Sequence, residues 1–193
     1  MENLGAVALR ATTKAGEVSR ASQLRALAVQ APKDEDGLPV IRDALAALPR
    51  SLVVWRPHKP GSRASLARAL SERERAALSA RAAAIEIALE PFGAGEVENV
   101  EAQLLAMFSG FRAMKQQGED AEAMVAITRA VLHDLPAWAI TKACLKIARG
   151  DAELDKRFSP NDSEIREVAL AVVAPYRRAL RDANELLEAE VTR

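Results

Sequence analysis

The chain has few of the side chains that build disulfides, metal sites or large aromatic cores. It contains one cysteine, two histidines, two tryptophans, one tyrosine and four phenylalanines. A single cysteine, Cys144, excludes an internal disulfide and fits a reducing compartment. No apolar run approaches the roughly 20 residues that a membrane-spanning helix needs, and the first residues lack the basic and apolar regions of a signal peptide. These absences predict a cytoplasmic protein with no membrane partner.

The sequence also lacks a recognisable catalytic or metal-binding pattern. His58 and His133 lie far apart, and Cys144 matches no zinc-ligand spacing with either of them. A nucleophilic site would have to combine His133 with Cys144 or Ser163, and no local signature supports one. The stretches GAGE and KPGSR do not follow the phosphate-loop pattern. We therefore expect a protein that is not an enzyme and that uses no metal or other cofactor.

Net charge is absent as well, but the charges are unevenly distributed. Residues 1–63 carry ten basic and six acidic side chains, a net charge of +4, and residues 64–193 carry −4. No acidic residue lies between Asp43 and Glu72, while basic residues accumulate there up to Arg68. This interval is a candidate contact for a polyanion such as DNA. Its candidate nucleic-acid-binding residues are Arg50, Arg56, Lys59 and Arg63.

Alanine is abundant, and it favours helices because it loses no side-chain entropy when a helix forms. We expect an all-α fold, a bundle of about five helices at 64–193 that follows a flexible, mildly basic N-terminal tail at 1–63. The apolar periodicity predicts helices after the capping pair Ser71 and Glu74, and over about 97–115, 120–133, 136–149 and from 162 onward. Short helices are also expected at 18–30 and 38–48, and SLVV (51–54) resembles a strand with no partner to join.

The apolar stripes predict which side chains are buried. The helix over 120–133 should bury Met124, Ile127, Val131 and Leu135. The helix over 136–149 should bury Ile140, Ala143, Cys144 and Ile147, and Gly150 should end it. The last helix should bury Ile165, Val168, Val172, Tyr176, Leu180, Ala183 and Leu187.

The last helix has a clear start signal and an internal proline. Asn161 and Glu164 form a variant capping box, worth about 1 kcal/mol at the cap. Because the apolar phase continues across Pro175, we expect one long helix that is kinked there. Its spacing from Tyr176 onward is heptad-like for about two repeats. The C-terminal helix is therefore a candidate surface for homo-oligomers.

The segment 126–150 has the outline of a helix-turn-helix, two helices joined by a turn of about four residues. Lys142, Lys146 and Arg149 share one face of its second helix, and Lys156 and Arg157 extend the basic region. Such a face suits phosphate neutralisation. The same lysines on any soluble helix would serve solubility, and the base-reading positions 137–139 hold poor hydrogen-bond donors.

Three aromatic residues are candidate partner-binding anchors, Trp55, Trp138 and Tyr176. The alternative for Trp138 is core packing, with Phe158 folding the 150–158 loop back over the helix junction. Trp55 lies between prolines and arginines and has the composition of a docking peptide.

The stretches LPAWAITKACLKIARG and RFSPNDSEIRE together resemble a family of small helical proteins from prophages and rhizobial-type genomes. The upstream LSERERAALSARAAAIEIALEP is similar to a segment of that family, so the resemblance covers about residues 70–170. FSPND departs from the family pattern, in which a second proline is common. Some members are distantly similar to the helical part of phage replication proteins that load or organise the replicative helicase.

This resemblance implies a non-enzymatic adaptor in phage-type DNA replication, with DNA or a replication or phage protein as its partner. The alternative is a phage or prophage structural or regulatory factor that binds only proteins.

Overall fold

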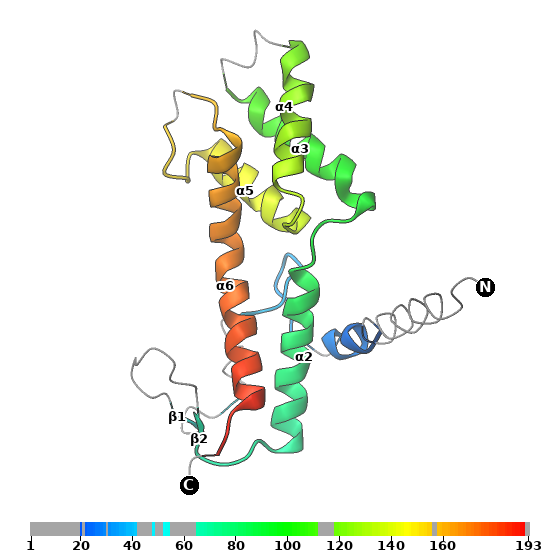
Figure 1. The fold of residues 1–193 in the computed structure, drawn as a ribbon, viewed down its shortest axis with the longest axis vertical. Coiled ribbons are helices and arrows are strands. Elements are labelled where there is room, and N and C mark those ends of the chain that lie inside the picture. The colour runs from blue at the N-terminus through cyan, green and yellow to red at the C-terminus, as the bar shows by residue number, and fades with distance from the viewer. Residues whose placement is uncertain are drawn as a thin grey trace, which may run out of the picture. The chain divides into compact units, whose positions relative to one another are not determined.

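The computed structural model describes residue 20 and the ranges 22–29, 31–41, 48, 52–54, 65–111, 118–155 and 158–191. Helices dominate these residues, which confirms the expected all-α class (Figure 1). Residues 22–28 are helical. The later helices are α2 (Glu72–Ala88), the short 3-10 helix η1 (Ala94–Glu96), α3 (Val97–Ser109), α4 (Gly118–Val131), α5 (Ala137–Arg149) and α6 (Asp162–Glu188). None of the helices described is long and apolar enough to cross a lipid bilayer.

The chain divides into two compact units. The first comprises Met1–Ala88 and Arg178–Arg193, and the second comprises Leu89–Arg177. The expected boundary near residue 63 does not separate these units. Described residues of the expected tail, among them Ala28, Leu48 and Leu52, are buried in the first unit.

In the first unit, α2 begins with the expected capping box. The Ser71 amide donates to Glu74 Oε2 at 2.9 Å, and the Glu74 amide donates to Ser71 Oγ at 3.3 Å. The mutual bonds satisfy backbone donors that a helix start leaves unpaired. The core of this unit joins α2 to the end of α6 through Leu66, Leu78, Ala82, Ala183 and Leu186.

Two local predictions in the first unit differ from the structure. Of the helix expected at 38–48, residues 38–41 are not helical, because the Asp34 carboxylate accepts the amide hydrogens of Asp36 and Leu38 and closes a turn. Residues 42–47 of that expected helix lie outside the part of the chain that the structure describes. The expected lone strand does have a partner, since β1 (Val53–Val54) pairs antiparallel with β2 (Ser65–Leu66). The partner is too short for its alternation to be visible in the sequence.

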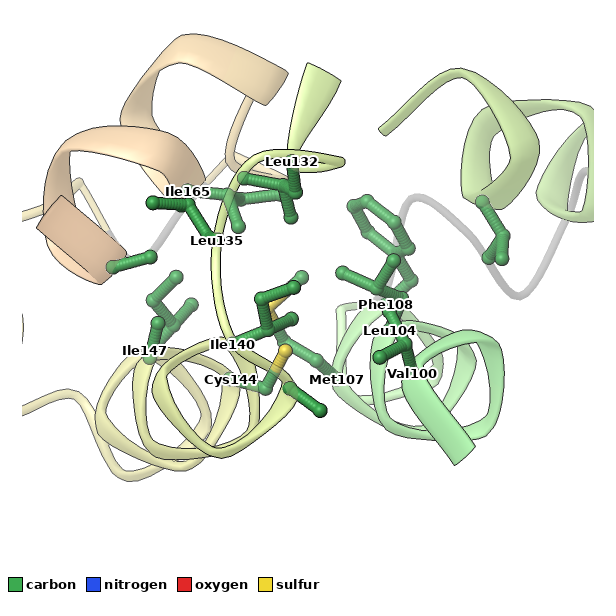
Figure 2. Packing of buried hydrophobic residues seen from close by; sticks show 14 residues of the cluster. Val100, Leu104, Met107, Phe108, Leu132, Leu135, Ile140, Cys144, Ile147 and Ile165 are labelled. Atoms are coloured by element: carbon green, nitrogen blue, oxygen red, sulfur yellow. The ribbon is translucent and has the colours of Figure 1, made fainter. Parts of the chain in front are cut away.

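The second unit is built around one apolar core. Figure 2 shows labelled side chains from α3, α5, α6 and the turn after α4 directed toward a common interior. All four residues that α5 was expected to bury are buried, Ile140, Ala143, Cys144 and Ile147. Gly150 ends α5 with φ 73°, in the left-handed region, as expected.

The predicted buried face of α4 is partly wrong. Ile127 is 57% exposed, whereas Val125, Thr128 and Leu132 are buried. These three residues follow a helical spacing of three and four, but Thr128 is polar and interrupts the apolar pattern. Leu135 is buried, as expected. The preceding helix, α3, ends at Ser109, whereas the sequence predicted that it would continue to about residue 115.

The start of α6 confirms the second capping box. The Asn161 amide donates to Glu164 Oε2 at 2.8 Å, and the Glu164 amide donates to Asn161 Oδ1 at 3.0 Å. The helix continues through Pro175, as expected. Its buried residues differ in part from the predicted stripe and are Ile165, Ala169, Val173, Tyr176, Ala183 and Leu186.

Phe158 is 67% exposed, so it does not fold back over the core as predicted. Ala152 and Leu154 of the same loop pack against the core of the second unit instead. Ala152 and Leu154 therefore make the contact between this loop and the core that was predicted for the Phe158 ring.

Candidate nucleic-acid interface

One side of α5 faces away from the core and carries its basic residues. At about 100° per residue, Trp138, Lys142, Leu145 and Arg149 lie within an arc of about 60°, and Lys146 flanks them. We call these five residues the outward face of α5. Lys146 and Arg149 are exposed, Leu145 is 44% exposed, and Trp138 and Lys142 are partly buried. The helix contains no acidic residue.

An aromatic pair anchors the N-terminal end of the outward face. The rings of Trp138 and Tyr176 have centroids 4.8 Å apart and are tilted by 56°. Lys142 Nζ lies 5.9 Å from the centroid of the Trp138 ring, within the range of a cation–π interaction. At a partly exposed site this interaction contributes about 0.5–1 kcal/mol. Tyr176 is only 8% exposed, so it supports Trp138 and offers a partner little of its own surface.

The C-terminal end of the outward face carries Lys146 and Arg149 in the last turn of α5. The amides of Gly150 and Asp151 donate to the carbonyls of Ile147 and Lys146, at 3.0 and 2.9 Å, which closes the helix. Cations in this position also interact favourably with the negative end of the helix dipole. Both side chains are nevertheless exposed and lie on the same side of the helix as Lys142.

The N-terminal turn of α5 is not built for reading bases. Ala137 and Ile140 are 6% and 0% exposed, since they line the core of the second unit, and Ala139 is 0% exposed. In a helix-turn-helix protein the corresponding positions contact base edges in the major groove. The arrangement therefore offers contacts to phosphates along the side of α5 and no base readout from its N-terminal end.

Several predicted site residues cannot be placed. Six basic candidates and one aromatic candidate lie outside the residues that the structure describes, namely Arg50, Arg56, Lys59, Arg63, Lys156, Arg157 and Trp55. Arg68, at the end of the acid-free interval, makes a two-pronged ion pair with Glu74 at 2.8 and 2.9 Å. Hydrogen bonds from Arg68 and Ser71 lower the pKa of Glu74 to about 2. Arg68 thus has a carboxylate partner within its own unit.

Sequence reasoning missed a polar cluster in which α4, the turn after it and α6 meet. Arg166 donates to both carboxylate oxygens of Asp134, at 2.6 and 2.8 Å, and to the Val131 carbonyl at 2.6 Å. The Arg166 hydrogen bonds lower the pKa of Asp134 to about 2. Thr128, which is fully buried, donates its hydroxyl hydrogen to Asp162. The partners lie 32 to 35 residues apart, so no local pattern could have indicated them.

Cys144 and His133, two further chemistry-bearing residues in the described part of the chain, lie in unlike environments. Burial raises the pKa of the Cys144 thiol to about 12, which makes it a poor nucleophile. His133 is exposed, and its Nδ1 lies 2.9 Å from the Ala130 carbonyl oxygen. Within the described part of the chain, no group of three or more potential metal ligands comes together.

Comparison with known proteins identifies no relative that indicates the functional class of this protein. No protein-family model, no curated protein sequence and no solved structure matches this chain.

Proposed function

We propose that this chain is a non-enzymatic helical adaptor that contacts nucleic acid through the outward face of α5. The observation that carries the proposal is the run of three cations, Lys142, Lys146 and Arg149, on one side of a helix without acidic residues. Phosphate neutralisation by such side chains supplies the sequence-independent part of nucleic-acid binding. The resemblance to phage replication proteins suggests DNA replication as the setting.

The dimensions of the face predict the strength of this contact. From Lys142 to Arg149 the helix rises about 10 Å, at 1.5 Å per residue. One strand carries a phosphate about every 3.4 Å of helix axis in B-form DNA, so the face spans about three phosphates. Three contacts give weak, salt-sensitive binding, which suits an adaptor whose specificity comes from another partner.

The test is binding of a fluorescent DNA, measured by anisotropy at about 50 and 200 mM salt. Lys146→Glu/Arg149→Glu reverses two exposed cations and should weaken binding at the lower salt by at least about tenfold. The matched control is Lys33→Glu/Arg73→Glu, which changes the net charge equally at exposed positions of the first unit. The control should retain the affinity of the parent protein within about threefold.

Equal losses in the two double variants would show that net charge, and not this face, governs binding. No binding by the parent protein at the lower salt would remove the nucleic-acid proposal. The rival function, a phage or prophage interaction factor that contacts only proteins, would then be the better account.

A further inference from the structure

The outward face of α5 is not purely basic. Leu145 is 44% exposed and lies between the cations along the helix, three residues after Lys142 and four before Arg149. Trp138 lies at the N-terminal end of the same face, seven residues before Leu145, and is partly exposed. The face therefore alternates an aromatic ring, a cation, an apolar side chain and a cation over about 16 Å of helix.

A DNA duplex offers few favourable contacts to the apolar side chains of this face, Trp138 and Leu145. Double-stranded DNA presents phosphates and sugars along its outside, and its bases are stacked within the helix. Side chains reach the base edges only through the grooves. In the N-terminal turn of α5, Ala137, Ala139 and Ile140 are buried, so these residues cannot enter a groove. Bound to a duplex, Leu145 and Trp138 would lie against charged, hydrated backbone.

A single strand fits both halves of the pattern. Its bases are free to unstack and lie against aromatic or apolar side chains, while its phosphates follow a basic strip. Each base has an apolar face, so such contacts do not depend on sequence. The aromatic support that Tyr176 gives to Trp138, at 4.8 Å between centroids, holds the indole in place before binding.

A protein partner fits the same face less well. Lysine is depleted in protein–protein interfaces, whereas arginine is enriched. Two of the three cations here are lysines.

We infer that the outward face of α5 binds single-stranded nucleic acid, with Lys142, Lys146 and Arg149 on phosphates and Trp138 and Leu145 against bases. This inference rests on the proposed function, because it requires that the face bind nucleic acid at all. It adds the class of ligand and assigns roles to two side chains that phosphate binding alone does not need.

The experiment uses the full chain with Trp55→Phe, so that Trp138 is the one tryptophan that reports. Its fluorescence and the anisotropy of labelled ligands are followed with oligothymidylate, oligouridylate and a duplex, each of about 16 nucleotides or base pairs. Both single strands should quench Trp138 and bind at least about tenfold more tightly than the duplex. The two single strands distinguish DNA from RNA as the source of the ligand.

A matched pair of substitutions tests the apolar contact. Leu145→Gln should weaken single-strand binding about threefold and leave duplex binding unchanged. Leu105→Gln is the control, because Leu105 has a similar exposure of 46% but lies on α3. It should change neither affinity.

The outcomes separate the two levels of the proposal. Equal affinity for single strand and duplex, with no change in Trp138 fluorescence, would overturn this inference and leave phosphate binding by α5 intact. The same holds if Leu145→Gln and Leu105→Gln behave alike. No binding of any of the three ligands would overturn both the inference and the proposed function.

Discussion

At the scale of single residues, the second unit is stabilised by polar contacts that could not be predicted from its sequence. Arg166 reaches Asp134 and the Val131 carbonyl, and Thr128 reaches Asp162. Each bond joins α6 to α4 or to the turn after it, so their joint effect is to fix the start of α6. Apolar periodicity identifies none of these bonds, because it treats Thr128 and Arg166 as solvent-facing.

Asp134→Asn should destabilise the protein modestly and alter its response to acid. Because the Asp134 side chain is 41% exposed, solvent screens the pair, and the loss at neutral pH should be about 1 kcal/mol or less. The folded-state pKa of Asp134 is lowered from 3.8 to about 2. The stabilisation is therefore complete above the unfolded-state pKa and is lost as the pH falls from about 4 toward 2.

Urea unfolding between pH 6 and pH 2.5 checks this prediction. The difference in unfolding free energy between parent and Asp134→Asn should shrink as the pH falls. Asp151→Asn removes an equal charge from an exposed side chain and serves as the control. A difference that stays constant with pH would contradict the assigned role of the pair.

Thr128→Val should cost more than its nearly equal volume suggests. The substitution removes a buried hydroxyl that donates to a carboxylate, and hydrogen bonds to charged groups contribute about 1.5–3 kcal/mol. Thr128→Ser keeps the donor and should retain more of the stability. Chemical denaturation of the two variants measures the difference, and a Val variant as stable as the parent would rule out a stabilising bond.

At the scale of elements, prediction succeeded where apolar pattern and end signals agreed. The buried face of α5 and its glycine end were both predictable, because the core residues repeat at helical spacing and Gly150 follows them. The capping boxes at Ser71 and Asn161 were predictable because they depend on residues only three positions apart. In α4 the pattern failed, because a buried threonine replaced an apolar residue. The prediction that Phe158 packs over the core was wrong, because the size and aromaticity of a side chain do not reveal which loop residues reach the core.

Gly150→Ala should destabilise the end of α5. At φ 73° a Cβ atom is strained, and the expected loss is about 1 kcal/mol. The matched control is Gly95→Ala, since a Cβ at Gly95 would meet no atom within 4 Å and its φ is not in the left-handed region. Thermal and urea unfolding of both variants checks the prediction. Equal stabilities would contradict the assigned backbone conformation.

At the scale of the whole molecule, composition was enough to predict the helical class. The division into two units was not predictable, because it depends on contacts between segments distant in sequence. Within α6, Ile165 and Ala169 belong to the core of the second unit, and Ala183 and Leu186 belong to the core of the first. One continuous apolar stripe gave no sign of this division.

Cys144 should report on the opening of the second unit. The thiol is 3% exposed and its pKa is raised to about 12, so a thiol reagent should react only when the core opens. Leu132→Ala leaves a cavity in the same core and should speed labelling at least about tenfold. Absorbance of the released reagent measures the rate. Fast labelling of the unmodified protein under native conditions would contradict the buried position of Cys144.

The central claim, that the outward face of α5 binds phosphates, is tested most directly by the salt dependence of single-strand binding. For about three phosphate contacts, the plot of log affinity against log salt concentration should have a slope near −2. Lys146→Glu/Arg149→Glu should make the slope shallower by about 1.4, the equivalent of two contacts on a single strand. An unchanged slope in this variant would contradict the claim.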